Sequence, residues 1–463
     1  MIRIFRHYIS GVFLGLILLE FAVFLSAVYV GYLVRFFEAK NLSFNYTHLT
    51  TALFFSFTLI VSFTGMGLYR RSNSWGKAGL HLRILAAFAL GALVMTLYFY
   101  SFPDFFAGRG VFGFVLIYSL LGVTILRYLF YKYSNHRDLG RRVLVLGVGE
   151  NAKKIVELGE EGRNLNLNVV GCIRMGEEEC HVDASKLVES KTSLNEYAIT
   201  NDIDEVVVAP DERRCGLPVD EILDCKMNGF DVVDFLTFFE REAGLIKVDS
   251  LHPSWIVFSD GFRVGNLRHV AKRVFDIGAS IILLVAAWPV MIITAIAIWV
   301  ESGGKGPIFY SQVRVGANWE LFKIIKFRSM KIDAEKDGQV QFATLNDSRI
   351  TRVGAFIRKT RIDEFPQLFN VLKGQMSFVG PRPERPEFVE KYAETIPYYS
   401  ERHRVKPGIT GWAQLCYPYG EGEEDALEKL QYDLYYLKNY SLFLDMMIIL
   451  QTTEIILWGK GAR

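Results

Sequence analysis

One stretch of this chain contains KFRSM at 326–330, DSRITRVG at 347–354, RKTRIDEFPQL at 358–368 and GPRP at 380–383. Lysine and arginine are dense throughout it, and Asp363 and Glu364 form an adjacent carboxylate pair near its middle. Cations bind the oxygens of phosphate groups, and a carboxylate can hold a metal ion or attack phosphorus. The stretch therefore predicts a site for a phosphorylated, multiply anionic substrate.

The composition indicates a membrane protein of two or three domains. The chain has 463 residues, of which 51% are hydrophobic and 14% aromatic, and its mean hydropathy is +0.21. These values are too apolar for an ordinary soluble protein. The five cysteines form no CxxC pair, so we expect reduced thiols rather than a disulfide framework or a zinc site.

Four apolar runs, at 9–34, 51–69, 84–102 and 111–131, reach the roughly 20 residues that cross a bilayer. They predict a four-helix transmembrane bundle over 1–136, and the first run is too long for a cleavable signal. The loops on one side hold most of the arginines and lysines, so the N-terminus and everything after the fourth helix should face the cytosol. Glu20, inside the first run, is expected to face the bundle interior in a structural role, with a functional role as the alternative.

Residues 137–250 predict a Rossmann-like, doubly wound α/β domain. The apolar strand at 142–146 runs into Gly147-Val148-Gly149, and further strand-like runs follow at 168–173, 205–209 and 231–235. Gly147 and Gly149 are candidate cofactor-binding residues, although no acidic residue ends the second strand. A scaffold or oligomer contact is the favoured role, a regulatory nucleotide site stays open, and the missing Tyr-x-x-x-Lys pair argues against catalysis here. Residues 251–267 are an aromatic connector.

A fifth apolar run, 274–300, carries a single charged residue, Asp276. Basic residues flank both of its ends, and Pro289 near the middle removes a helical hydrogen bond and bends the axis. These features predict a re-entrant helix that enters and leaves by the cytosolic face. A kinked fifth span is the alternative.

Six motifs follow one another after residue 270: KRxxD at 272–276, QVRVG at 312–316, KFRSM at 326–330, DEFPQL at 363–368, GPRP at 380–383 and KPGITGW at 406–412. Together they make residues 268–463 resemble the bacterial sugar transferases, the monotopic polyprenyl-phosphate glycosyl-1-phosphate transferases. The preceding segments resemble those of the larger members that initiate exopolysaccharide or O-antigen synthesis. The implied fold is a mixed α/β catalytic domain anchored by the re-entrant helix.

The resemblance implies an enzyme of the bacterial inner membrane that transfers sugar-1-phosphate from a UDP-sugar to undecaprenyl phosphate and releases UMP. Asp363 would be the nucleophile that carries the phosphosugar covalently, and Glu364 would bind Mg²⁺. Adjacent residues on an α-helix point about 100° apart, so one carboxylate can reach phosphorus while the other reaches the metal.

The residues themselves and the resemblance together give seven candidate substrate-binding residues. Lys326 and Arg328 should share one face of a strand. Arg361 is expected to be structural, and Gln375 stands where many members carry an acid. The candidates are Lys326, Arg328, Arg358, Arg382, Arg385, Arg404 and Asp433.

Two other readings stay open: a membrane-bound nucleotide-sugar dehydratase, and a non-catalytic membrane scaffold that senses nucleotide for a polysaccharide assembly complex. Besides its substrates and membrane lipid, we expect a homodimer through the bundle or the middle domain and no nucleic-acid partner. No residue pattern specifies the sugar.

Overall fold

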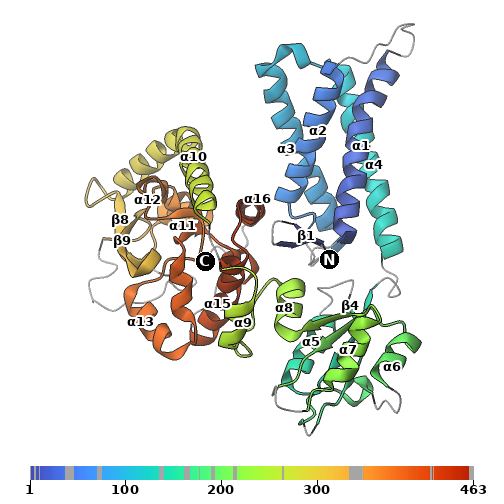
Figure 1. The fold of residues 1–463 in the computed structure, drawn as a ribbon. Coiled ribbons are helices and arrows are strands. Elements are labelled where there is room, and N and C mark those ends of the chain that lie inside the picture. The colour runs from blue at the N-terminus through green and yellow to red at the C-terminus, as the bar shows by residue number, and fades with distance from the viewer. Residues whose placement is uncertain are drawn as a thin grey trace. The chain divides into compact units, whose positions relative to one another are not determined.

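The computed structural model describes residues 2–4, 7–9, 11–36, 46–69, 76–134, 140–160, 167–176, 178–188, 193–211, 216–262, 265–332, 347, 349–417, 420 and 422–457. Tyr8–Ala243 and Gly244–Arg463 belong to two different compact units. Figure 1 shows the helices and strands of both. Two short strands pair near the N-terminus, β1 (Ile2–Ile4) and β2 (His7–Ile9).

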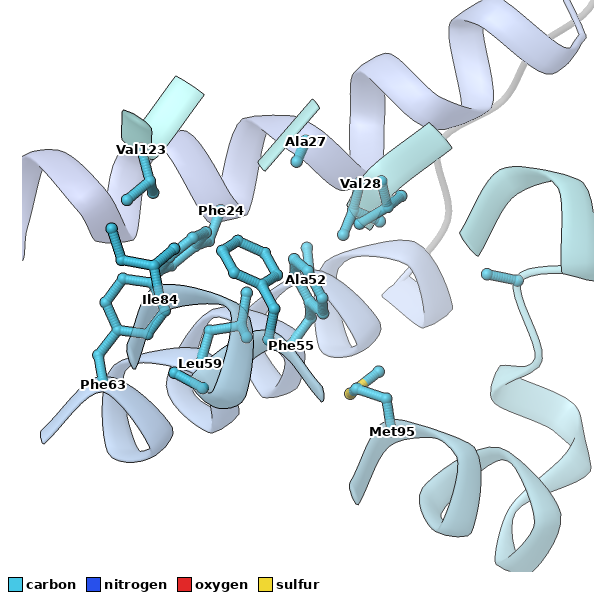
Figure 2. Close-up of a cluster of buried hydrophobic side chains, with 14 of the residues drawn as sticks. Phe24, Ala27, Val28, Ala52, Phe55, Leu59, Phe63, Ile84, Met95 and Val123 are labelled. Atoms are coloured by element: carbon cyan, nitrogen blue, oxygen red, sulfur yellow. The ribbon is translucent and has the colours of Figure 1, made fainter. Parts of the chain in front are cut away.

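Four long apolar helices share one core in the first unit: α1 (Gly11–Arg35), α2 (Tyr46–Gly65), α3 (Gly76–Ser101) and α4 (Arg109–Ser134), with the 3-10 turn Pro103–Phe105 before α4. Phe24, Phe55, Phe63 and Val123 are buried in that core (Figure 2). Hydroxyl groups on α2 donate to carbonyls one turn earlier, as Ser56 does to Ala52, which satisfies them in apolar surroundings. With α10, described below, five helices in the described residues are long and apolar enough to cross a membrane.

Glu20 faces the interior of these helices, as expected. Its carboxylate accepts hydrogen bonds from Arg127 Nε at 2.6 Å and from the Tyr69 hydroxyl, and both Glu20 and Arg127 are fully buried. Arg127 also donates to the carbonyl of Leu68 at 3.3 Å, so the ion pair ties α1 and α4 to the segment after α2.

The second half of this unit is a five-stranded parallel sheet in the order β5-β4-β3-β6-β7. Its strands are β3 (Arg141–Leu146), β4 (Leu167–Ile173), β5 (Leu187–Val188), β6 (Glu205–Val208) and β7 (Asp231–Asp234). Its helices are α5 (Glu150–Glu160), the turn Ala184–Lys186, α6 (Leu194–Thr200), α7 (Val219–Met227) and α8 (Phe235–Ala243). The four predicted strands are present, and the order reverses between β3 and β6 as in doubly wound folds.

Gly147 and Gly149 lie in the turn from β3 into α5, where the chain contacts itself. Gly147 has φ +133°, and a Cβ at Gly149 would lie 2.1 Å from the carboxylate of Asp211. The first N–H groups of α5, those of Glu150 and Asn151, donate to Asp211 at 2.8 and 2.9 Å. A helix N-terminus of this type binds phosphate in nucleotide-binding folds. A nucleotide at the predicted site would therefore have to displace Asp211.

The second unit contains the motifs. Its helices are α9 (Pro253–Phe258), α10 (Asn266–Glu301), α11 (Arg352–Lys359), α12 (Gln367–Lys373), α13 (Pro386–Thr395), α14 (Trp412–Cys416), α15 (Glu423–Lys438) and α16 (Leu442–Leu457). An antiparallel pair joins β8 (Phe309–Val315) to β9 (Leu321–Phe327), and a parallel pair joins β10 (Ser377–Val379) to β11 (Gly408–Thr410). Its described residues also contain the 3-10 turns Ala317–Trp319, Ile362–Glu364 and Tyr399–Arg404.

Both ends of α10 are bound to this same unit. Near its start, Lys272 donates to Asp445 at 2.6 Å, and Asp276 accepts from the backbone N–H of Phe378 at 3.2 Å. At its end, Glu301 accepts from the N–H of Arg352 at 2.8 Å. Between them, the helix contains Pro289, bends in Figure 1, and exposes a row of large apolar side chains. These are Ile282, Leu283, Val285, Trp288, Ile292 and Ile293.

Replacing Arg127 by Leu should strongly destabilise the α1–α4 core, because Glu20 would remain buried without its cation. Breaking a buried pair in this way costs about 3–5 kcal/mol. Thermal unfolding in detergent should show a large loss for Arg127→Leu and a partial recovery for Glu20→Leu/Arg127→Leu. Arg109→Leu, at an exposed arginine at the start of α4, is the control. Equal unfolding temperatures for Arg127→Leu and Arg109→Leu would contradict a stabilising role.

Replacing Asp211 by Ala should loosen the start of α5, since two N–H groups would lose their acceptor. A lost helix cap costs about 1 kcal/mol. Hydrogen exchange should therefore quicken at the amides of Glu150 and Asn151. Glu157→Ala, at an exposed position on the same helix, should leave both amides unchanged. Undiminished protection in Asp211→Ala would show that this carboxylate does not hold the turn.

Candidate active site

Asp363 and Glu364 lie in the 3-10 turn Ile362–Glu364, between α11 and α12. Arg361 enters that turn with φ +60°, in the left-handed region. The sequence interpretation placed the pair on an α-helix with side chains about 100° apart, whereas a 3-10 turn rotates about 120° per residue. The two carboxylates still point in different directions, so one can meet a substrate while the other meets a cation.

Three cations surround Glu364. Lys326 Nζ donates to its Oε1 at 2.9 Å, and guanidinium nitrogens of Arg361 and Arg382 lie 3.9 Å from the same oxygen. Burial by itself would raise the pKa of Glu364, but Lys326, Arg382 and Arg361 outweigh it and lower that pKa to about 2. Glu364 is therefore an anion at neutral pH.

Asp363 has the opposite electrostatic environment. Its side chain is 9% exposed, and its Oδ1 has no hydrogen-bond partner among the described residues. Burial and the adjacent charge of Glu364 raise the pKa of Asp363 to about 6, against the pull of Lys326, Arg361 and Arg358. Neighbouring carboxyl groups whose pKa values are driven apart are typical of pairs with separate chemical roles. An unpartnered carboxylate oxygen is also suited to attack phosphorus, because no donor holds its lone pairs.

Lys326 and Arg328 were predicted to share one face of a strand. Of these two residues, only Lys326 bonds to a carboxylate of the pair among the described contacts. Lys326 is the penultimate residue of β9 and pairs with Tyr310 on β8. Arg328 lies just past the end of β9, and its guanidinium faces the carbonyl oxygen of Lys305 at 3.4 and 3.5 Å. A substrate-binding role for Arg328 stays a prediction.

Arg382 is held at the site by the interlocking of two motifs. The N–H of Gly380 donates to Thr410 and the N–H of Gly408 donates to Pro381, each at 2.9 Å. A Cβ at Gly380 would lie 2.2 Å from the carbonyl oxygen of Lys406, so only glycine allows this approach. The GPRP and KPGITGW segments are therefore held together by backbone hydrogen bonds, although more than twenty residues separate them in the sequence.

Asp433 lies behind that loop, with no described contact to Asp363 or Glu364. It forms an ion pair of 2.9 Å with Arg402, which in turn donates to the carbonyl of Arg382 at 3.0 Å. Burial raises the pKa of Asp433 to about 6, although Arg402 opposes the shift. The pair is thus placed to support the backbone of Arg382.

The remaining candidates occupy three different settings. Arg358 is the penultimate residue of α11 and is close enough to Asp363 to lower its pKa. Arg385 precedes α13, and Arg404 is an exposed residue paired with Glu401. The sequence interpretation gave Arg361 a structural role and did not consider Arg402, whereas Arg361 lies near Glu364 and Arg402 donates to the carbonyl of Arg382. The segments RKTRIDE and ERHR show that positive charge is present there, but a linear pattern does not indicate where each arginine side chain points.

The donor set fits a hard divalent cation such as Mg²⁺. The described residues contain no cluster of three or more His, Cys, Asp or Glu side chains that could hold a metal. Mg²⁺ is, however, commonly held by one or two carboxylates together with substrate phosphates. Glu364, ionised beside the unpartnered Asp363 oxygen, can supply that carboxylate.

The comparisons with known proteins identify relatives of this chain. The family model described as bacterial sugar transferase matches residues 267–459. The UDP-N-acetylgalactosamine-undecaprenyl-phosphate N-acetylgalactosaminephosphotransferase of Aeromonas hydrophila is 43% identical over 239 residues, which are 52% of this chain and 55% of that protein. The exopolysaccharide production protein PSS of Rhizobium leguminosarum bv. phaseoli is 40% identical over 198 residues, 42% of this chain and 98% of that protein.

One relative is similar along most of both chains. The UDP-glucose:undecaprenyl-phosphate glucose-1-phosphate transferase of Xanthomonas campestris pv. campestris is 31% identical over 434 residues, which cover 88% of this chain and 86% of the relative. With the family match over residues 267–459, this extended similarity shows that the chain belongs to the bacterial sugar transferase family.

Proposed function

We propose that this protein transfers sugar-1-phosphate from a UDP-sugar to undecaprenyl phosphate through a covalent phosphosugar–Asp363 intermediate, and releases UMP. The observation that carries the proposal is the pair Asp363–Glu364. Asp363 Oδ1 has no hydrogen-bond partner among the described residues, and Glu364 is surrounded by Lys326, Arg361 and Arg382. The names of the relatives support the two substrates. The reaction would be the first membrane step of exopolysaccharide or O-antigen synthesis.

In the first step, an Asp363 oxygen would attack the phosphorus that bears the sugar. The bond from this phosphorus to the bridging oxygen of the diphosphate breaks, and UMP leaves with that oxygen. In the second step, a phosphate oxygen of undecaprenyl phosphate would attack the same phosphorus and break its bond to Asp363. The product is a diphosphate-linked sugar on the lipid, and the carboxylate is regenerated.

The other residues would stabilise charge. Arg382 and Lys326 carry the positive charge that diphosphate oxygens need, and Glu364 would hold Mg²⁺ beside them. When bound, Mg²⁺ would neutralise charge on the diphosphate as UMP leaves. The relatives named above act on different sugars, glucose and N-acetylgalactosamine, so the shared reaction does not identify the sugar here.

For the membrane, we propose that α1–α4 form a transmembrane bundle in the bacterial inner membrane with the catalytic unit on the cytosolic side. The contacts of α10 support a re-entrant helix. Lys272 and Glu301, near its two ends, both bind the same compact unit, whereas a straight helix would place these two residues about 44 Å apart, at about 1.5 Å per residue. The homodimer stays a prediction.

UMP release tests the reaction. Purified protein with Mg²⁺, undecaprenyl phosphate and a panel of UDP-sugars should release UMP with one or two of them. Asp363→Asn should lower the rate by at least about 1,000-fold, because the nucleophile is lost. Chelating the metal or replacing Glu364 by Gln should also suppress release, and Glu394→Gln, at an exposed acid on α13, is the control. Undiminished release by Asp363→Asn would refute the covalent route, and a folded protein silent with every sugar would favour the scaffold reading.

Thiol labelling of intact spheroplasts tests the topology. A membrane-impermeable maleimide should modify Tyr46→Cys, because the start of α2 would face outward. It should leave both Asn266→Cys and Lys305→Cys unmodified until the membrane is opened, since a re-entrant helix keeps both of its ends in the cytosol. Labelling of Lys305→Cys but not of Asn266→Cys in sealed spheroplasts would instead identify α10 as a fifth span.

A further inference from the structure

Asn370, on α12, is a fully buried polar residue that makes three side-chain hydrogen bonds. Its Nδ2 donates to the carbonyl oxygen of Lys323 at 2.8 Å and to Gln375 Oε1 at 2.9 Å, and its Oδ1 accepts from the N–H of Ile325 at 3.1 Å. Two of the three bonds are therefore to the backbone of β9.

These two bonds reproduce the pairing that a neighbouring strand would make. β8 and β9 form a two-stranded sheet, so one edge of β9 has no strand beside it. The carbonyl of Lys323 and the N–H of Ile325 are two residues apart and therefore face the same edge. The Asn370 amide supplies one donor and one acceptor there. Because a backbone N–H can only donate and a carbonyl can only accept, the orientation of this amide is determined.

Asn370 also closes the end of α12. Its own carbonyl oxygen accepts from the backbone N–H groups of Gln375 at 3.1 Å and Met376 at 3.3 Å, and Gly374, immediately before Gln375, has φ +83°. Gln375 then accepts the remaining Nδ2 hydrogen of Asn370. One residue thus joins β9, the end of α12 and the start of the segment that leads to β10.

The next residue along β9 after Ile325 is Lys326, whose ammonium group lies 2.9 Å from Glu364. Glu364 stands on the turn that leads directly into α12. The Asn370 side chain therefore connects the segment that carries the cation to the segment that carries the carboxylates. A shift of about 1 Å between such groups can cost about 100-fold in rate.

We infer that Asn370 is a positioning residue that sets β9, and with it Lys326, against the turn of Asp363 and Glu364. It would touch neither substrate nor the reacting atoms and would act through Lys326. The inference rests on the proposed function for its catalytic consequence, while the anchoring of β9 can be measured independently of any reaction.

The experiment is a double-mutant cycle on UMP release with Asn370→Ala and Lys326→Met. Asn370→Ala alone should lower kcat about tenfold with little change in KM. In the Lys326→Met background the same substitution should cost less than about twofold, because the residue through which it acts is already gone. If the two effects multiply fully, Asn370 does not act through Lys326 and the inference is overturned.

A matched control separates positioning from general damage to a buried asparagine. Asn439 is equally buried, and its side chain donates to Tyr435 on α15, with no described contact to β9. Asn439→Ala should therefore combine with Lys326→Met multiplicatively. If both asparagine substitutions have non-additive effects with Lys326→Met, the coupling comes from global destabilisation and the inference is overturned.

Hydrogen exchange supplies the measurement that needs no activity. In Asn370→Ala, protection of the Ile325 amide should fall at least about tenfold, because its acceptor is removed. Protection of core amides on α15 should stay close to that of the wild type. Unchanged protection at Ile325 would overturn the inference whatever the enzyme does. A wild-type protein without UMP release, but with the expected loss at Ile325, would instead reject the proposed function and keep the anchor.

Discussion

The second unit is organised around the electrostatic cost of two adjacent carboxylates in a buried place. Asp363 and Glu364 repel each other and are both shielded from water, so at least one needs cations close by. Lys326, Arg361 and Arg382 supply them to Glu364, while Asp363 Oδ1 has no hydrogen-bond partner in the part of the chain that the structure describes. The asymmetry is useful chemically, because it separates a group that can hold a metal from a group that can attack phosphorus. It also requires segments that are far apart in the chain to converge on one oxygen.

Backbone contacts made by buried polar side chains provide that convergence. Arg402 holds the carbonyl of Arg382, and Asn370 holds the edge of β9 beside Lys326. Asp276 on α10 accepts from the N–H of Phe378 on β10, so the apolar helix is built into the same framework. Each of these side chains bonds to main-chain groups whose positions do not depend on a rotamer. This is a direct physical way to place a catalytic group within a fraction of an ångström.

In the first unit, buried or backbone-bonded charged side chains have structural roles. The buried pair of Glu20 and Arg127 joins helices whose other contacts are apolar and carry little directional information. In the α/β sheet, Asp211 takes the place at the start of α5 where a phosphate binds in related folds. A sheet of nucleotide-binding topology can therefore persist as a structural module, with its own carboxylate as the anion.

Local patterns in the sequence already determined much of this protein. The apolar runs predicted the long helices, the short apolar runs predicted the strands of the parallel sheet, and the ordered motifs indicated the family and the two carboxylates. These properties depend on neighbouring residues, which a linear pattern records. The tertiary structure alone decided which cations reach Glu364: Arg361 does so through a left-handed residue and a 3-10 turn, while Arg328 turns toward Lys305 beyond the end of its strand. It also decided that Asp211, 61 residues away, fills the turn at Glu150. Side-chain direction and long-range contact depend on how segments pack, and no local pattern contains that information.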